Sequence, residues 1–472
     1  MIFRRFYDAG LAQASYLIGC DGTSDAIVID PNRDVEQYIA AAAAEKLHIR
    51  FVTDTHIHAD YVSGARELAH LTGAALHLSA EGGAEWQYAF AAQDGATLLH
   101  DGDSIRVGRI RVDVLHTPGH TPEHLAFLVT DEAMSDRPVG IASGDFVFVG
   151  DVGRPDLLER AANFADTMRD SARVLYRSLE RFRALPDYLQ LWPGHGAGSA
   201  CGKALGAMPQ STVGYEKIAN WALATRSEEA FIEEVLAGQP EPPTYFADMK
   251  RINRLGAPML NGLPHPPMLE GTALADTLAN GTLVIDTRST DAYAAGFVPG
   301  TLNVPLSKAF STYAGWFVPY DKPVCFIANS SDDAHLAARE LAMIGLDHVT
   351  GWFPASAVSD WVTSSRTLGE VRQLHVSNIP FPLSSNVVVI DVRNRSEWDH
   401  GHIPGAIHIP MGHLPRRLAD IPRGRPIVMH CQGGSRSAIG SSVLLRSGID
   451  DVQNLRGGFA EWERQGKPII RD

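Results

Sequence analysis

Histidine and aspartate side chains follow several predicted strands in the first half of the chain. They are His56, His58 and Asp60 after a strand predicted over residues 49–53, and His120, Asp145 and His195 after three later strands. Imidazole and carboxylate groups together are typical ligands of transition metals. Because four strand ends in a strand-helix pattern each deliver such a side chain, the spacing predicts a metal site.

A second reactive group lies near the end of the sequence. Cys431 follows a strand predicted over residues 427–430 and precedes an apolar helix. Glycines in the loop between them let successive backbone N–H groups point at the sulfur, and the helix N-terminus adds positive potential, so both favour the thiolate. We expect Cys431 to be a nucleophile and Arg436 to hold an anion such as thiosulfate or sulfite. The other loop residues expected to bind the substrate are Gln432, Gly433, Gly434 and Ser435.

Composition places these groups in ordinary globular domains. The chain has 472 residues, of which 45% are apolar and 20% charged, and about 150 residues per domain suggests roughly three domains. The formal net charge of −14 argues against a nucleic-acid-binding protein, because such a protein needs a basic surface. No apolar run is long enough to predict a membrane span.

At the N-terminus we predict strand, turn and strand over residues 1–31, with the turn at Asp21-Gly22, and then a helix over residues 35–46.

The cysteines indicate a reducing compartment. Four of them scattered over the chain are too few for a disulfide framework. Arg4-Arg5 and the later Cys20 superficially resemble a signal peptide, but the stretch between them lacks a continuous apolar core. We therefore expect a cytoplasmic protein.

The second half of the chain contains an internal repeat. Matching positions are separated by 105 residues: Asp286 and Asp391, Arg288 and Arg393, Tyr293 and Trp398, Gly296 and Gly401, Pro305 and Pro410. A period near 100 residues indicates two copies of one domain. Before the repeat, prolines crowd residues 238–267 and predict a linker without regular structure. The predicted organisation is residues 1–237, a Pro-rich linker over 238–267, a first repeat over 268–370 and a second over 371–472.

Residues 1–235 resemble the metallo-β-lactamase superfamily. The order H-x-H-x-D, then a lone His, a lone Asp and a lone His matches that family, which implies an αββα sandwich. In its dinuclear hydrolases the motif continues with a His that holds a second metal. Here that position is Tyr61, a poor zinc ligand, so one iron with two His and one carboxylate is favoured over two zinc ions.

The segment Asp151-Val-Gly-Arg154-Pro-Asp156 resembles the persulfide dioxygenases within that superfamily. The resemblance implies one Fe(II) per chain, held by His56, His120 and Asp145. It also implies that His58, Asp60 and His195 surround the metal or hold water, and that Arg154 holds the thiol substrate or orients its loop.

Cys201 lies in a Gly-rich segment six residues after His195. Proteins that fuse a persulfide dioxygenase to rhodanese-like domains have a cysteine in a similar segment, which implies a catalytic role as a sulfur relay. The alternative is a small buried residue, as most free cysteines are. Both interpretations stay open at this point.

Residues 375–472 resemble the rhodanese family, a doubly wound α/β fold. The matching motifs are Asp391-x-Arg393, Gly401-His-Ile-Pro-Gly-Ala406 and Gly457-Gly-Phe-x-x-Trp462. The loop from Cys431 to Arg436 is one residue shorter than in the related phosphatases, which favours sulfur transfer. In the first repeat Ala328 stands at the position of Cys431, and Asp333 at that of Arg436. That copy is expected to be inactive, with Cys325 in its core.

These resemblances predict an α/β multidomain enzyme that oxidises a low-molecular-weight thiol persulfide with O₂ to sulfite. Sulfur transfer at Cys431 then gives thiosulfate and removes sulfide. One alternative is a zinc-dependent thioester hydrolase of the glyoxalase II type with an appended sulfurtransferase, and another is a non-catalytic sulfur carrier or sensor. We expect neither nucleic acid nor membrane as a partner, and we expect a homo-oligomer.

Overall fold

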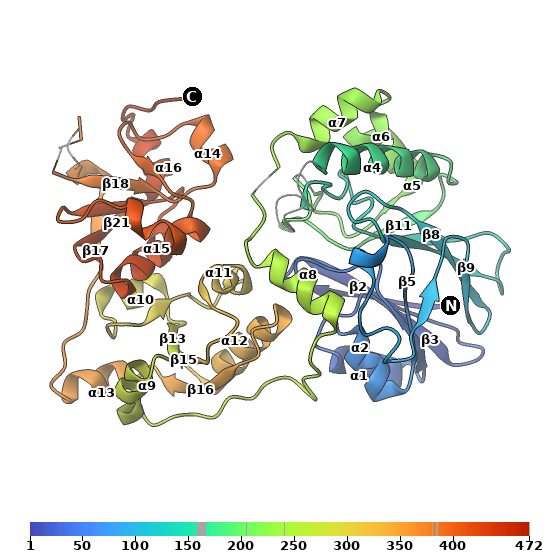
Figure 1. The fold of residues 1–472 in the computed structure, drawn as a ribbon, viewed down its shortest axis with the longest axis horizontal. Coiled ribbons are helices and arrows are strands. Elements are labelled where there is room, and N and C mark those ends of the chain that lie inside the picture. Colours follow the sequence, from blue (N-terminus) through green and yellow to red (C-terminus); the bar gives the residue numbers. More distant parts are fainter. Residues whose placement is uncertain (158–166, 204, 240, 380, 384–385, 472) are drawn as a thin grey trace. The chain divides into compact units, whose positions relative to one another are not determined.

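A computed structural model describes residues 1–157, 167–203, 205–239, 241–379, 381–383 and 386–471 (Figure 1). The chain divides into two compact units. One comprises Met1–Leu263 with Ala342–Gly345, and the other Pro264–Leu341 with Leu346–Asp472.

The first sheet of the first unit begins with antiparallel strands and continues with parallel ones. Its spatial order is β1 (Ile2–Asp8), β2 (Gln13–Gly19), β3 (Asp25–Ile29), β4 (His48–Thr53), β5 (Ala75–Ser79) and β6 (Thr97–Leu99). The N-terminus thus has one strand more than predicted. The additional turn forms because Oδ1 of Asp8 accepts the N–H groups of Gly10 (2.9 Å) and Leu11 (3.1 Å), as short polar side chains do at turns.

The second sheet carries most of the predicted metal ligands at its strand ends. Its order is β12 (Ser211–Thr212), β11 (Gln190–Pro193), β10 (Gly140–Gly144), β9 (Leu125–Asp131), β8 (Ile110–His116) and β7 (Ser104–Val107). Strand β9 is antiparallel to β8 and to β10, and β10 is parallel to β11. Strands β8, β10 and β11 therefore run in one direction, and the residues that follow them share one edge of the sheet.

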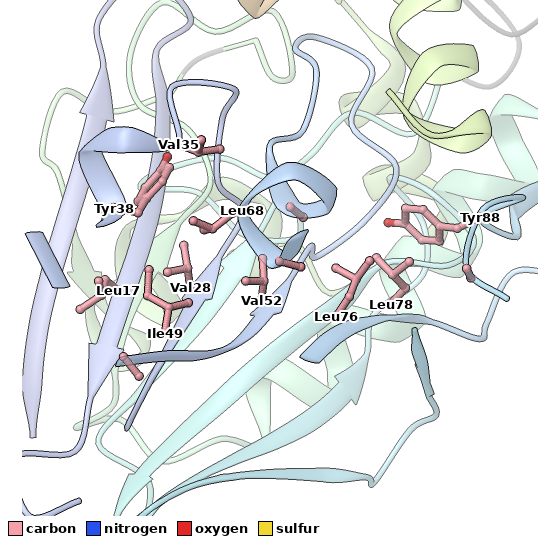
Figure 2. Close-up of a cluster of buried hydrophobic side chains, with 14 of the residues drawn as sticks. Leu17, Val28, Val35, Tyr38, Ile49, Val52, Leu68, Leu76, Leu78 and Tyr88 are labelled. Carbon is pink, nitrogen blue, oxygen red and sulfur yellow. The ribbon is translucent and has the colours of Figure 1, made fainter. Parts of the chain in front are cut away.

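Three apolar clusters define four layers in this unit. Alternate residues of β2 and β3, such as Tyr16 and Ile27, pack with Phe127 and Trp192 from the second sheet. The outer face of the first sheet is covered by α1 (Glu36–Ala44), α2 (Ala65–Thr72) and the 3₁₀ turn η1 (Ala84–Trp86), as Figure 2 shows for Leu17, Val28, Tyr38 and Leu68. The outer face of the second sheet packs against α4 (Met168–Arg183), α5 (Val213–Ala219), α6 (Trp221–Ala224) and α7 (Glu228–Leu236). Helix α1 confirms the helix predicted over residues 35–46.

The Pro-rich segment is not irregular throughout, and this part of the prediction is wrong. Residues Phe246–Leu255 form helix α8, which belongs to the first unit. The reason is the position of the prolines, because Pro243 precedes the helix and Pro258 follows it. Proline disrupts a helix only from its interior. The domain borders given above stay predictions.

The second unit contains two parallel sheets of the same topology. The first has the order β14 (Leu302–Asn303), β13 (Leu283–Asp286), β15 (Val324–Ala328), β16 (Val349–Pro354). The second has the order β19 (Ile407–His408), β18 (Val388–Asp391), β20 (Ile427–His430), β21 (Val452–Arg456), with β17 (Arg372–His375) added beside β21. In the described part of the chain, five helices and one 3₁₀ turn accompany the first sheet. They are η2 (Gly271–Ala273), α9 (Leu274–Ala279), α10 (Thr290–Ala295), α11 (Phe310–Phe317), α12 (Ser331–Met343) and α13 (Ala357–Thr363). The second sheet has α14 (Arg395–His400), α15 (Ser435–Arg446), α16 (Gly458–Arg464) and the turns η3 (Val376–Asn378), η4 (Met411–Arg416) and η5 (Leu418–Asp420).

The repeated Asp-x-Arg motif has the same structural role in both copies. Arg393 forms hydrogen bonds to Asp391 and donates to the carbonyl oxygen of Gly401 (2.7 Å). Arg288 does the same with Asp286 and the carbonyl oxygen of Gly296 (3.0 Å). A buried charge is tolerated where it is paired in this way, so in each repeat the motif fixes the loop after the helix that follows it, which is α10 in the first copy and α14 in the second. Within the described ranges, no helix combines the length and apolar character needed to cross a membrane.

Candidate metal centre and thiol site

The three predicted iron ligands lie together at the edge of the sandwich. His56 follows β4, His120 follows β8 and Asp145 follows β10. Nε2 of His120 lies 3.4 Å from Oδ2 of Asp145, and Nε2 of His56 lies 3.9 Å from the same oxygen. One ligand atom of each residue lies within 4.8 Å of the others, and all three side chains are buried.

The second ring nitrogen of each histidine is fixed by a hydrogen bond. Nδ1–H of His120 donates to the carbonyl oxygen of Arg154 (2.9 Å). The Thr55 hydroxyl donates to Asp30 (3.0 Å) and lies 2.9 Å from Nδ1 of His56, whose N–H it can therefore accept. Both rings thus direct Nε2 toward Asp145, which is the arrangement found around metal-bound histidines.

Several atoms of this cluster fit a bound metal ion. Nε2 of His56 and both carboxylate oxygens of Asp145 are buried without a hydrogen-bond partner among the described residues. Buried polar atoms are normally paired. Burial lowers the pKa of His56 well below its usual range, and burial also lowers the pKa of His120, so both rings are neutral. Burial opposes ionisation of Asp145, but His195 and His120 outweigh it and lower the pKa of this carboxyl. Neutral imidazoles with a carboxylate are the protonation states that metal binding needs.

Two of the expected neighbours lie on the other side of Asp145. Nε2 of His195 is 3.5 Å from Oδ1 of Asp145 and 3.2 Å from Oδ2 of Asp60. Nδ1–H of His195 donates to the carbonyl oxygen of Ala12 (3.1 Å). Cys201 joins this group, since its sulfur lies within 4.8 Å of ligand atoms of Asp60 and His195. Burial first, and then Asp60 and Asp145, raise the pKa of the Cys201 thiol well above its usual range.

His58 turns partly away from the metal ligands. Its Nε2 lies 3.2 Å from Oδ1 of Asp30 and 3.0 Å from the Tyr61 hydroxyl. Burial would lower the pKa of His58, but Asp30 raises it to about 9. Nδ1 of His58 is buried and unpaired among the described residues. Tyr61, which stands where the dinuclear hydrolases have the histidine of a second metal, therefore contacts the second motif histidine.

The guanidinium of Arg154 is held by a carboxylate and by a carbonyl group of a neighbouring loop. Its guanidinium donates two hydrogen bonds of 2.7 Å to Asp156 and one of 3.2 Å to the carbonyl oxygen of Ala200. Its own backbone N–H donates to the carbonyl oxygen of Cys201 (3.0 Å). Arg154 thus connects the loops of His120 and Cys201. These contacts support the loop-orienting alternative, because the side chain is fully buried.

Sequence patterns missed two residues that support the ligands. His124 lies outside the predicted ligand motif, yet its Nε2 accepts the backbone N–H of Asp145 (3.0 Å). Oε1 of Glu123 accepts the backbone N–H of Ile57 (2.8 Å), between the two motif histidines. No local spacing signals either role, because each partner comes from a different strand end.

Asn253 on helix α8 holds the loop that carries the histidine motif. Its Nδ2 donates to the carbonyl oxygens of His58 and Tyr61 (2.7 Å each), and its Oδ1 accepts the N–H of Ser63 (2.9 Å). Asn253 is 5% exposed, so the loss of these bonds leaves buried polar groups unpaired.

Asn253→Leu is expected to lower the free energy of unfolding by about 2–4 kcal/mol, because several buried groups lose their partners. Metal content should fall as well, since the ligand loop loosens. Urea unfolding and metal analysis check both effects. Arg251→Leu, at a 56% exposed side chain on the same helix, is the matched control and should change stability by less than about 1 kcal/mol. Equal stability of the two variants would contradict the assigned role of Asn253.

The thiol site forms where β20 meets α15. Cys431 is 1% exposed, and its sulfur accepts the backbone N–H of Gly434 (3.1 Å). The Ser437 hydroxyl lies 3.5 Å from the sulfur. Gly434 has a φ of +102°, a conformation that only glycine adopts readily. Gln432, Gly433 and Ser435 are exposed around it, so the loop offers its outer face to a ligand.

Arg436 already has a carboxylate partner. Its terminal nitrogens donate to the two oxygens of Glu397 at 2.7 and 2.6 Å. Burial would raise the pKa of Glu397, but the hydrogen bonds from Arg436 lower it. A two-pronged pair of this kind fixes the guanidinium in one orientation. An anion at Cys431 would share Arg436 with Glu397.

The equivalent loop of the first repeat begins an ordinary helix. Ala328 ends β15 and is fully buried. The Ser330 hydroxyl accepts the N–H of Asp333 (3.1 Å), as an N-terminal helix cap does. Cys325 lies inside β15 in the core of this repeat, as expected. The inactivity of this copy stays a prediction, supported by the lack of a thiol at position 328.

The sequence was compared with known families and structures. The metallo-beta-lactamase superfamily profile matches residues 9–195, and the rhodanese-like domain profile matches residues 271–351 and 382–465. A crystal structure of a metallo-beta-lactamase from Staphylococcus aureus is 41% identical, with a TM-score of 0.68, and the match covers 75% of this chain and 99% of that one. The chain belongs to the metallo-beta-lactamase superfamily. Its second part contains rhodanese-like domains. The predicted fold class and the predicted fusion are therefore confirmed.

Two curated relatives match the separate parts of this metallo-beta-lactamase family member. The human persulfide dioxygenase ETHE1 is 29% identical over 199 residues, which is 41% of this chain and 68% of the relative. A sulfurtransferase of Allochromatium vinosum is 38% identical over 87 residues, which is 18% of this chain and 81% of the relative. Both parts of the chain are thus similar to enzymes.

Proposed function

We propose that this chain oxidises the persulfide of a low-molecular-weight thiol with O₂ at one Fe(II) per chain and transfers sulfur at Cys431. The observation that carries the proposal is the buried group of His56, His120 and Asp145 with its unpaired ligand atoms. The similarity to persulfide dioxygenases and to a sulfurtransferase supports the two activities.

Iron held by His56, His120 and Asp145 would supply redox chemistry toward O₂ and the persulfide. The protein's contribution is to fix the ligands and exclude water. The carbonyl oxygen of Arg154 fixes the tautomer of His120, and the His124 ring accepts the N–H of Asp145. Asp60 and His195 are positioned to hold a proton or a water beside the ligands.

The proposed oxidation balances as RSSH + O₂ + H₂O giving RSH, sulfite and two protons. The outer sulfur is oxidised and O₂ is reduced. At Cys431 the thiolate attacks the outer sulfur of a second persulfide, so that RS⁻ leaves and a cysteine persulfide forms. Sulfite then attacks the outer sulfur of that persulfide, which releases thiosulfate and restores the thiolate. The N–H of Gly434, 3.1 Å from the sulfur, stabilises the anionic forms.

The role of Cys201 as a sulfur relay also belongs to this proposal. Its sulfur lies in the same buried group as Asp60 and His195, which supports a contact with substrate sulfur. The full burial of the thiol fits a step inside the metal domain.

Oxygen uptake with different thiol persulfides tests the proposal. Glutathione, coenzyme A and cysteine persulfides are compared in an oxygen electrode, with metal analysis of protein produced with ample iron. We expect about one iron per chain and O₂ consumption that depends on the persulfide. The zinc thioester hydrolase is the competing candidate, and two zinc ions per chain with thioester cleavage would replace the proposal. Tyr61, in place of a second-site histidine and in contact with His58, weighs against that candidate.

A further inference from the structure

The first repeat packs directly on the repeat that carries Cys431. The Trp316 ring on α11 lies so close to Gly412 of η4 that no Cβ would fit at position 412. The rings of Trp316 and His413 are 6.3 Å apart between centroids. At another point the Ser442 hydroxyl on α15 accepts the N–H of Asn303 at β14 (3.0 Å). Helix α11 is therefore fixed against the second repeat.

Tyr313 and Trp316 are three residues apart on α11 and so lie on one face of that helix. Tyr313 is half-buried, and the charged groups that act on it belong to the second repeat. Burial raises the pKa of the Tyr313 phenol, Arg436 lowers it, and Cys431 and Glu397 raise it again. The raised pKa keeps the phenol neutral, so its hydroxyl can donate a hydrogen bond.

The first repeat reaches the cysteine loop on a second flank. A cavity of about 190 Å³ is lined by Thr290 and Asp291 at the start of α10 and by Gly433, Gly434 and Ser435. Arg456, which also lines the cavity, lies 3.9 Å from Asp291. Both contacts place parts of the first repeat beside the residues expected to bind the sulfur donor.

We propose that the first repeat forms a wall of the Cys431 site, and that the Tyr313 hydroxyl donates a hydrogen bond to an oxygen atom of a thiosulfate donor beside Arg436. The inference rests on the proposed role of Cys431 as sulfur acceptor. Glu397 engages both terminal nitrogens of Arg436, so a dianion such as thiosulfate gains from an additional neutral donor. The first repeat has no thiol at position 328, yet it determines which donor binds.

Steady-state sulfur transfer from thiosulfate to cyanide by the full chain tests the wall. Tyr313→Phe removes only the hydroxyl and is expected to raise KM for thiosulfate about tenfold, as the loss of one hydrogen bond to a charged group does, with kcat within twofold. Mercaptoethanol persulfide has no sulfonate oxygens, so its KM should not change. Tyr293→Phe is the matched control, because the Tyr293 hydroxyl donates to the carbonyl oxygen of Thr301 (3.1 Å) inside the first repeat. Its KM should equal that of the unaltered chain.

An unchanged KM for thiosulfate in Tyr313→Phe would contradict the proposed role of the first repeat. An equal rise in KM for both donors would contradict it as well. Those outcomes leave the role of Cys431 intact. Failure of the proposed function looks different. In that case the unaltered chain would transfer no sulfur, or Cys431→Ser would transfer sulfur as fast as the unaltered chain. That result overturns the wall together with the proposed function.

Discussion

Asp145→Ala is expected to abolish both metal binding and O₂ uptake. Asp145 lies at the centre of the ligand group, because its Oδ2 lies near His56 and His120 and its Oδ1 lies near His195. Without the carboxylate, two neutral imidazoles remain, and no anionic ligand offsets the charge of a divalent cation in this buried place. We expect metal content below about a tenth of that in the unaltered chain, and no persulfide-dependent O₂ consumption.

Inductively coupled plasma mass spectrometry measures the metal, and an oxygen electrode measures the uptake. Asp136→Ala, in the exposed turn between β9 and β10, is the matched control and should keep both properties. Far-ultraviolet circular dichroism checks that Asp145→Ala is folded. Full iron loading of a folded Asp145→Ala protein would refute the ligand assignment.

Cys431→Ser is expected to keep O₂ uptake while the product changes from thiosulfate to sulfite. A thiolate among N–H donors accepts sulfane sulfur but does not activate O₂, whereas the metal group offers no sulfur carrier of this kind. Serine preserves the size of the side chain, so the Gly434 N–H keeps an acceptor. Thiosulfate should fall at least about a hundredfold, since an alcohol at neutral pH is a far weaker nucleophile than a thiolate.

Product analysis by thiol derivatisation and chromatography, at equal O₂ consumption, measures this change. Cys325→Ser is the matched control, because Cys325 lies in the core of the first repeat beside Thr350. Its products should be those of the unaltered chain. Undiminished thiosulfate from Cys431→Ser would mean that the two sites act independently.

Local sequence determined the candidate ligands and the repeat of this protein. His56, His120 and Asp145 lie in the loops after β4, β8 and β10. Within the second sheet, the shared direction of β8 and β10 brings the loops of His120 and Asp145 to one edge. The 105-residue offset between Asp286 and Asp391 reflects two copies of the same fold, so the sequence pattern alone predicted the repeat. Such features depend on residues that are near in sequence, or on strand order that a family shares.

Only the tertiary structure decided which side chains support these groups. Asn253 holds a loop almost two hundred residues earlier in the chain, and its helix lies within a segment whose prolines suggested irregular structure. The partners of His124, Tyr61 and Arg436 likewise come from other elements. Buried hydrogen bonds of this kind depend on the distance between packed elements, which no local spacing encodes. The contact of Trp316 with Gly412, and with it the place of Tyr313, exists only once the two repeats have packed together.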